Sequence, residues 1–547
     1  MQKFFLLSTC LLAGLMAPHA GAADVTVHLQ LTAANALDVS YRIPKTCATL
    51  TFLNHETLPQ FGKEIRAAWQ ALDDCASVNG ETITKTNQTC SNLHFRVPAS
   101  KKVFDRVSPG SFPVGEGLFV NTTNYAVGDQ CGKVAYHFSA AGSIAFKGQL
   151  FQKEATYQEP DAQYMPLLLL QKQIAIKNGA ISYFDPALAE ENRLLLQNSA
   201  EQAIDFYRRA LPDLHFRTPI LTATAVNDGG YFSYWGDAGD VMRLALYNWP
   251  SPATPEADAR LRKFVWHEFA HRFQPSSTIV KVGRDPFIVE GGADYLRWVG
   301  GIKNKQLGVK EAEQEINTAL SNCISKTGDS SWKSLPETLT HRGSFPYECG
   351  LALHVMGLAA RQNNSDALQQ MNDYYLALDK GESIEFAQAI ECGKDKNCTP
   401  SWLPKLLGDQ PLKATWSAFF VETQLAKVSG PNREQIADLQ RQAFASLMQT
   451  DCMGNISFRR TPHDFSIEAI PACKVLREGM QINEIENLPL FTDILVVDEM
   501  NRACETRGKV SLGLVNGEKI FVACKTPFAL PTYYAVDMPR LLRKHNL

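Results

Sequence analysis

The stretch Trp266-His267-Glu268-Phe269-Ala270-His271 places two histidines four residues apart, with a glutamate directly after the first. On an α-helix this spacing puts both imidazole rings on one face, one turn apart, where they can bind a single metal ion. Neutral imidazole suits Zn²⁺, and a catalytic zinc needs a third protein ligand and one position open to water. The stretch therefore predicts a helix with a zinc site on one face.

The third ligand is expected from a second helix, which is predicted to begin at Asp285-Pro286 and to carry Glu290 in its first turns. Eighteen residues separate His271 from Glu290. Glu268 lies one residue round the first helix from His267, where it flanks the water of a catalytic zinc and takes its proton. We therefore predict His267, His271 and Glu290 as metal ligands and Glu268 as the general base.

The residues around the motif favour a buried helix over a chance match on a solvated one. Thr254 is a predicted N-cap, and Pro255-Glu256-Ala257-Asp258 supplies a proline and acidic groups for the first turn. An apolar stripe at helical spacing runs along the same segment, formed by Leu261, Val265, Phe269 and Phe273. A motif on such a helix is placed in the core of a domain.

The composition describes an ordinary globular protein. The chain has 547 residues, 45% hydrophobic and 20% charged, with a formal net charge of −3. This length predicts more than one domain, each with ample core. A charge balance so close to neutral gives no reason to expect nucleic acid or an anionic membrane as a partner.

The N-terminus has the pattern of a secretory signal. Lys3 precedes the apolar run Phe4–Met16, and the small residues Ala20-Gly21-Ala22-Ala23 follow, so residues 1–22 are predicted to be removed. An uncleaved anchor is the alternative, although the apolar run is short for a membrane span. No later stretch has the length of a transmembrane helix. We expect an exported protein, periplasmic or extracellular, without stable membrane insertion after cleavage.

Cysteine usage agrees with export. Of 13 cysteines, Cys10 lies in the signal, and the other twelve form an early, a middle and a late group of four. An even number in an exported chain predicts disulfides within domains. The spacing favours the bridges Cys323–Cys349, Cys392–Cys398, Cys452–Cys473 and Cys504–Cys524, and it leaves the four early cysteines unassigned. A metal site at Cys392 and Cys398 is the alternative to a bridge there.

The chain divides into three predicted domains of an α+β protein. Residues 23–160 are predicted to be β-rich, with strands at Val25–Leu31, Leu37–Tyr41, Leu93–Val97 and Gly142–Phe146 and one helix at Gly62–Leu72. Residues 161–449 are predicted to form the catalytic domain, with a helix at Leu194–Leu211, strands at Leu221–Val226 and Val241–Leu246, the metal helix, and further helices from Glu311 to Met448. Residues 450–547 are predicted to form a small β-rich domain with a hairpin turn at Asn516-Gly517.

The metal motif resembles that of the gluzincin zinc peptidases, which combine H-E-x-x-H, a spacer of this length and a glutamate. It is most similar to the aminopeptidase N and leukotriene A4 hydrolase group and to the glycyl aminopeptidases. The segment Glu290–Tyr295 matches the group's E-G-x-A-x-Y signature, and Pro346–Gly350 is similar to its P-Y-E-K-G segment. The resemblance covers residues 190–440. It implies a thermolysin-like peptidase domain, one Zn²⁺ per chain, a peptide or protein substrate, and Tyr347 as the donor that stabilises the oxyanion.

Three further comparisons with these families bear on function. The G-x-M-E-N strand, whose glutamate grips a free peptide N-terminus, has no match upstream of His267, so exopeptidase and endopeptidase action both stay open. Glu290-x-x-x-Asp294 is similar to thermolysin-type enzymes, which implies that Asp294 holds a zinc-binding histidine; a solvent-facing helix aspartate is the alternative. Residues 476–485 are compatible with a PDZ-like turn and strand, as in the last module of the glycyl aminopeptidases.

Two other functions are consistent with the same residues. One is a peptide-binding protein on a peptidase scaffold whose zinc is not catalytic, with the last module adding peptides as strands. The other is a zinc hydrolase of non-peptide substrates. For Tyr347, buried packing beside Cys349 is the alternative to a catalytic role. A complete set of ligands, base and tyrosine favours a zinc peptidase.

Overall fold

The structure is a computed structural model that describes residues 24–33, 35–53, 59–101, 110–157, 165–227, 232–275, 285–341, 343–362, 365–453, 458–461, 463–467, 472–528 and 530–547. The predicted signal at residues 1–22 lies outside these ranges. The chain divides into two compact units, Met1–Ile204 with Arg217–Glu268, and Asp205–Phe216 with Phe269–Leu547. Helix α3 (Pro255–Ala270) runs from the first unit into the second.

The N-terminal part of the first unit is β-rich, as predicted. Side chains alternate along β1 (Val25–Ala33), where Val25, Val27 and Leu29 are fully buried and the residues between them are not; this period of two gives a strand one buried face. A nine-stranded sheet has the order β4-β7-β2-β1-β10-β12-β9-β8, with β11 on β10. Its other strands are β2 (Ala36–Arg42), β4 (Gln70–Ala71), β7 (Asn92–Pro98), β8 (Ser111–Val114), β9 (Gly117–Asn121), β10 (Val134–Phe146), β11 (Gln149–Tyr157) and β12 (Pro166–Leu170). A three-stranded sheet of β3 (Thr49–Thr51), β6 (Thr82–Lys85) and β5 (Ala76–Val78) contributes to the same core.

The helix in this part is shorter than the sequence predicts. The prediction of Gly62–Leu72 was wrong at its end, because α1 (Pro59–Arg66) stops at Arg66 and Gln70–Ala71 pairs with β7 instead. The cause is tertiary: the indole of Trp69 enters the core and stacks on Tyr125, with ring centroids 5.5 Å apart. Core packing of one aromatic side chain overrides the helical tendency of the segment.

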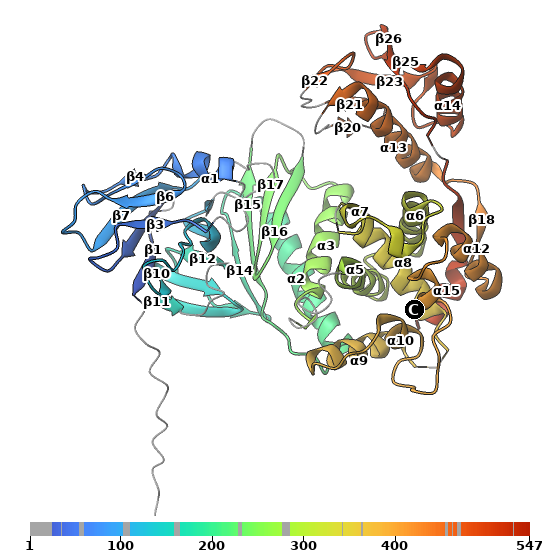
Figure 1. The fold of residues 1–547 in the computed structure, drawn as a ribbon. Helices are drawn as coiled ribbons and strands as arrows, with labels where there is room; N and C mark the ends of the chain where they lie inside the picture. The colour runs from blue at the N-terminus through green and yellow to red at the C-terminus, as the bar shows by residue number, and fades with distance from the viewer. Residues whose placement is uncertain are drawn as a thin grey trace, which may run out of the picture. The chain divides into compact units, whose positions relative to one another are not determined.

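A five-stranded sheet precedes the metal helix, in the order β13 (Ile176–Lys177), β14 (Ala180–Phe184), β15 (Ile220–Val226), β17 (Val241–Tyr247) and β16 (Ser233–Ala238). Strands β14, β15 and β17 are parallel, so a long connection is needed, and α2 (Glu190–Ala210) supplies it. Strand β16 pairs antiparallel with β17 (Figure 1). Phe264 of α3 packs edge-on against Tyr234 of β16, with centroids 5.2 Å apart, which holds α3 on this sheet.

Helices dominate the second unit from residue 286 to residue 451, as predicted. They are α5 (Pro286–Lys303), α6 (Val309–Thr327), α7 (Glu337–Thr340), α8 (Phe345–Ala359), α9 (Ala367–Asp379), α10 (Phe386–Glu391), α11 (Leu403–Leu406), α12 (Leu412–Thr423) and α13 (Arg433–Asp451). Helix α5 begins at the predicted Asp285-Pro286. Asn432 caps α13 by accepting a hydrogen bond from the Gln435 backbone N–H at 2.9 Å.

Helices α5 and α8 touch backbone to backbone where Gly291 meets Gly350. A Cβ on Gly291 would lie 2.3 Å from Cα of Gly350, and a Cβ on Gly350 would lie 2.5 Å from Cα of Gly291. Carbon atoms in ordinary contact are about 3.5–4.0 Å apart. Neither position accepts a side chain unless the helices separate, so the two glycines of the signature segments fix Glu290 relative to the first turns of α8.

The C-terminal module has a small sheet of β20 (Phe458–Arg460), β21 (Phe465–Ile467), β23 (Gln481–Ile485), β24 (Leu488–Pro489), β25 (Lys509–Leu514) and β26 (Lys519–Ala523). Helices α13 and α14 (Leu495–Arg507) pack beside this sheet (Figure 1). Phe444 of α13, Val497 of α14 and Val510 of β25 belong to one hydrophobic core. The predicted hairpin is confirmed, with Gly517 at φ +87° in its turn. The sequence did not predict α14, because its β-branched opening is also typical of a strand.

The end of the chain returns to helices α5 and α8. Strand β27 (Tyr533–Val536) pairs antiparallel with β18 (Ala426–Ser429), and α15 (Met538–Lys544) follows. His545 is buried, and its Nε2–H donates to the Val355 carbonyl at 3.1 Å, while its Nδ1 accepts from the Tyr295 hydroxyl at 3.0 Å. These last residues therefore pack on α5 and α8, although the sequence division places them with the C-terminal module.

The twelve cysteines after residue 23 form six disulfides, each within one predicted domain. The four bridges favoured by spacing are confirmed: Cys323–Cys349, Cys392–Cys398, Cys452–Cys473 and Cys504–Cys524. The early cysteines pair as Cys47–Cys131 and Cys75–Cys90. Because Cys392 and Cys398 form a disulfide, the alternative of a metal site at these two cysteines is wrong.

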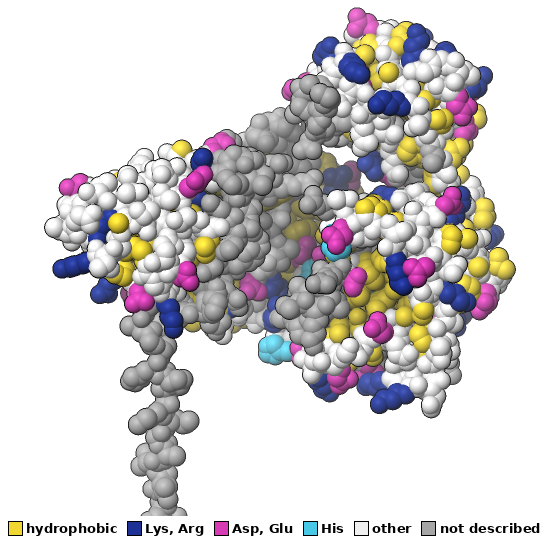
Figure 2. All heavy atoms as spheres, in the orientation of Figure 1, with side chains coloured by type: hydrophobic (Ala, Val, Ile, Leu, Met, Phe, Trp, Pro, Cys, Tyr) yellow, Lys and Arg dark blue, Asp and Glu magenta, His cyan; other side chains and the backbone are white. Residues whose placement is uncertain are grey.

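The surface carries charges of both signs. On the face drawn in Figure 2, Lys and Arg side chains alternate with Asp and Glu side chains over the described residues. Intermixed charges on this face are typical of a protein with a small net charge. Within the described part of the chain, no helix is both long and apolar enough to span a membrane.

Candidate metal centre

The candidate metal centre is built on the end of α3. The helix starts at a capped turn, where the Ala257 backbone N–H donates to Oγ1 of Thr254 at 3.2 Å, as predicted. The predicted stripe of Leu261, Val265, Phe269 and Phe273 is buried, with exposures of 1% or less. The regular helix ends at Ala270, and His271 follows in a tightened turn closed by the Phe273 N–H on the Ala270 carbonyl at 3.0 Å.

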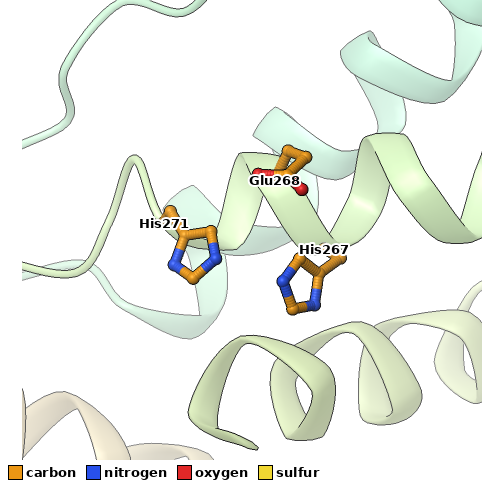
Figure 3. Close-up of side chains that lie close together, drawn as sticks. All are labelled: His267, Glu268 and His271. Atoms are coloured by element: carbon orange, nitrogen blue, oxygen red, sulfur yellow. The ribbon is translucent and has the colours of Figure 1, made fainter. Parts of the chain in front are cut away.

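The structure brings His267, Glu268 and His271 together. One ligand atom from each of the three side chains lies within 4.8 Å of the others. Figure 3 shows the imidazoles of His267 and His271 projecting from the same side of the helix. The side chains are largely shielded from water, with 7% exposure for His267 and 9% for Glu268. The spacing therefore produces the shared face that the sequence predicts.

Glu290 approaches the same group from α5. Its Oε2 lies 3.4 Å from Nε2 of His271. Both atoms are of the kind that bind Zn²⁺, and a carboxylate and an imidazole that share one ion approach each other in this way. The predicted third ligand is thus adjacent to the second, although eighteen residues separate them in sequence.

The donor set fits a divalent cation. Two imidazoles and one carboxylate are a known catalytic zinc combination. Oε2 of Glu268 is buried and has no hydrogen-bond partner among the residues that the structure describes. A buried carboxylate oxygen is costly unless it is paired, so its place beside the two imidazoles suits a base that meets a bound water.

Asp294 is one turn after Glu290 and is buried. Its Oδ1 accepts from Nε of Arg297 at 2.9 Å, and Arg297 also donates to Glu315 of α6 at 3.0 Å. Burial lowers the pKa of Arg297, but the carboxylates of Glu315 and Asp294 outweigh it and hold that pKa above its ordinary value. The alternative of a solvent-facing aspartate is wrong; the role of Asp294 toward a zinc-binding histidine stays a prediction.

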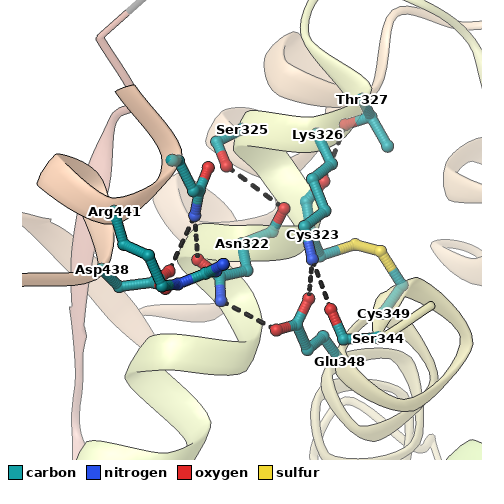
Figure 4. Close-up of polar contacts among 11 residues, drawn as sticks. Asn322, Cys323, Ser325, Lys326, Thr327, Ser344, Glu348, Cys349, Asp438 and Arg441 are labelled. Atoms are coloured by element: carbon teal, nitrogen blue, oxygen red, sulfur yellow. Dashed lines mark hydrogen bonds and ion pairs between the residues drawn. A yellow bond between two sulfur atoms is a disulfide. The ribbon is translucent and has the colours of Figure 1, made fainter. Parts of the chain in front are cut away.

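Tyr347 lies in the first turn of α8 and is 38% exposed. This exposure removes the alternative of buried packing. The next two residues make the contacts with α6 instead: Glu348 accepts from Asn322 at 2.9 Å and from Lys326, and Cys349 is bonded to Cys323 (Figure 4). The first turn of α8 is thus fixed to α6 while the tyrosine side chain reaches the surface.

Gln274 is a further residue of this site, and the sequence did not point to it. This residue is buried, follows His271 by three positions, and has its Oε1 2.7 Å from Nδ1 of His271. The spacing to His271 was the only signal in the sequence, and a glutamine three residues past a helical histidine is too common to predict a partner.

Comparisons with known proteins address the fold. No family model matches the chain, and neither does any curated protein. Among solved structures, it aligns with the crystal structure of an aminopeptidase N family protein from Idiomarina loihiensis at a TM-score of 0.55 and 14% identity, covering 95% of this chain and 99% of that one. This chain has the fold of that aminopeptidase N family protein.

Yeast leukotriene A4 hydrolase also aligns, at 12% identity over 78% of this chain and 71% of its own. Its TM-scores are 0.38 for the native enzyme and 0.35 for the complex with bestatin. Scores this low do not establish a common fold. The α+β fold with a β-rich N-terminal part is confirmed by the Idiomarina loihiensis structure, while the PDZ-like character of the C-terminal module is not.

Proposed function

We propose that this chain is a zinc-dependent peptidase that hydrolyses peptide bonds. The observation that carries the proposal is the convergence of His267, Glu268 and His271 within 4.8 Å, with Glu290 3.4 Å from His271. The shared fold with an aminopeptidase N family protein supports it. His267, His271 and Glu290 would hold one Zn²⁺, which when bound polarises a carbonyl and acidifies water.

The protein groups divide the remaining chemistry between them. Glu268 takes the proton of the attacking water and passes it to the leaving amine, a role for which its position directly after a ligand is suited. Tyr347 donates its O–H to the developing oxyanion. A donor of this kind is typically worth about 10²–10³ in kcat.

Asp294, if it positions a zinc-binding histidine, does so from a buried ion pair. Arg297 already fixes the orientation of its carboxylate. The resemblance to the thermolysin-type arrangement is what gives Asp294 this role toward a zinc-binding histidine.

The six disulfides support a protein exported to the periplasm or the outside of the cell. The small C-terminal sheet, flanked by two helices, is compatible with a PDZ-like module that receives peptides. Both statements are part of the proposal, as is removal of residues 1–22.

The test compares two glutamates of one helix. Glu268→Gln should keep one zinc per chain, measured by elemental analysis, and lose nearly all hydrolysis of a peptide library read by mass spectrometry. Glu256→Gln is the matched control, because Glu256 is an exposed partner of Arg260 at the start of α3. It should keep both zinc and activity. Chelation should abolish cleavage by the wild-type protein, and zinc should restore it.

The same digest decides the open points. Internal cuts indicate an endopeptidase, and trimming from the N-terminus indicates an aminopeptidase that anchors its substrate without the G-x-M-E-N strand. A protein that binds zinc and peptides but cleaves nothing would instead be the binding protein on a peptidase scaffold. A zinc protein that leaves every peptide intact and binds none would point to a non-peptide substrate.

A further inference from the structure

Gln274 is buried beside the candidate ligand His271, and its amide bridges two segments. The tightened turn after α3, with the Gln274 N–H 3.3 Å from the Ala270 carbonyl, folds its side chain back toward the imidazole. On one side Oε1 lies 2.7 Å from Nδ1 of His271. On the other side Nε2 lies 2.8 Å from the carbonyl oxygen of Val289.

The Val289 carbonyl determines which way the amide points. A carbonyl oxygen only accepts hydrogen bonds, so the group facing it must be the amide NH₂. The amide oxygen therefore faces His271 and can only accept. Nδ1 of His271 must then carry the hydrogen, which leaves the lone pair of a neutral ring on Nε2. This is the nitrogen that lies 3.4 Å from Oε2 of Glu290.

The same amide also joins the two ligand-bearing segments. Val289 directly precedes Glu290 on α5, so one side chain contacts His271 and the backbone beside the third ligand. The Gln274 amide donates further to the Tyr375 hydroxyl at 3.1 Å. Gly292 leaves room for this group, since a Cβ there would lie 2.3 Å from the Tyr375 hydroxyl and 3.3 Å from Nε2 of Gln274.

We infer that Gln274 is a positioning residue that sets the tautomer of His271 and holds it in register with Glu290. The inference rests on the proposed function, because it assumes that His271 and Glu290 bind zinc. Groups that orient a ligating histidine in this way typically change metal affinity by about 10- to 100-fold when they are removed. A buried amide with a purely structural role would change folding stability and leave the ligand nitrogen unaffected.

The experiment measures zinc affinity by competition with a chromophoric chelator. Gln274→Met, which removes the polar contacts with His271, Val289 and Tyr375 at similar volume, should weaken zinc binding by about 10- to 100-fold. Gln274→Glu keeps an acceptor for Nδ1–H but no donor for Val289, so it should bind zinc more tightly than the Met variant and more weakly than wild type. The control is Gln370→Met, since Gln370 is an equally buried glutamine whose amide donates to the Ala389 and Ile390 carbonyls. It should lower the melting temperature without changing zinc affinity.

A Gln274→Met protein with the zinc affinity of wild type overturns the inference. So does a Glu variant that binds zinc as weakly as the Met variant. If the Met variant does not fold, nitrogen-15 NMR of the metal-free wild-type protein reads the ring directly, with a His271→Ala variant for assignment. A hydrogen on Nε2 contradicts the inference, and one on Nδ1 supports it. Failure of wild-type zinc binding itself would instead contradict the proposed function.

Discussion

Gly291→Ala tests whether the crossing of α5 and α8 sets the geometry of the candidate site. The added Cβ would lie 2.3 Å from Cα of Gly350 and 2.4 Å from its carbonyl carbon. Because ordinary carbon contacts are about 3.5–4.0 Å, the helices have to separate by roughly 1 Å or more. Overpacking costs up to about 3 kcal/mol, and we expect the upper end because backbone atoms cannot rotate away.

One effect opposes this cost. Alanine is about 1 kcal/mol more favourable than glycine inside a helix, so the net loss should be about 2 kcal/mol. For a domain as large as residues 161–449, this loss in the free energy of unfolding corresponds to a fall of roughly 4–8 °C in melting temperature. Displacement of Glu290 from the first turn of α8 by the same distance should also lower turnover strongly, since a misplacement of about 1 Å can cost about 100-fold.

Thermal unfolding followed by circular dichroism, together with peptide hydrolysis, measures both effects. Gly430→Ala is the matched control, because no atom lies within 4 Å of a Cβ built there. It should leave melting temperature and turnover unchanged. If Gly291→Ala melts at or above the wild-type temperature, helix propensity outweighs the contact, and the close crossing of α5 and α8 is refuted.

Three further predictions concern the same unit. Tyr347→Phe should keep zinc and melting temperature but lower kcat by about 10²–10³; a fully active variant would remove the tyrosine from the mechanism. Burial lowers the pKa of His354 to about 4 and that of His545 to about 3. Both pKa values lie below the ordinary value for histidine, so the unfolded chain takes up protons at a higher pH than the folded chain does. The contribution of these histidines to the free energy of unfolding is therefore fully present above pH 6.5. It falls by up to about 1.4 kcal/mol per pH unit from each histidine as the pH drops toward 4. Urea unfolding at several pH values should therefore show a shallower slope for His545→Gln than for wild type. Arg297→Met, which removes the partner of buried Asp294 and of half-buried Glu315, should cost about 3–5 kcal/mol in urea unfolding. The same change at Arg441, the exposed partner of Asp438, should cost less than about 1 kcal/mol.

The sequence predicted the features that depend on local spacing. The helix α3, its Thr254 cap and its apolar stripe follow from residues a few positions apart. The same is true of the shared face of His267 and His271, because a helical period fixes it. Four disulfides could be predicted for the same reason, because their paired cysteines lie close together in the sequence.

Features that depend on partners far along the chain were not predicted. Helix α1 ends early because Trp69 packs on Tyr125. The return of His545 to α5 depends on Tyr295, which lies 250 residues away. Gln274 gains its importance from a carbonyl at Val289, and no residue pattern encodes the direction of a backbone group. The contact of Arg297, the partner of Asp294, with Glu315 of α6 could likewise not be predicted from the sequence.

The first turn of α8 shows why such distant contacts decide the site. Three separate constraints act on three consecutive residues: the contacts of Glu348 with α6, the disulfide of Cys349 to Cys323, and the backbone contact of Gly350 with Gly291. Each constraint restrains the backbone beside Tyr347, while the tyrosine itself stays 38% exposed. A catalytic donor gains most when its backbone is fixed before the substrate arrives, because no reorganisation is then needed in the transition state. Loss of the Cys323–Cys349 bond should therefore lower turnover more than it lowers zinc affinity, since the three proposed ligands lie on α3, its following turn and α5.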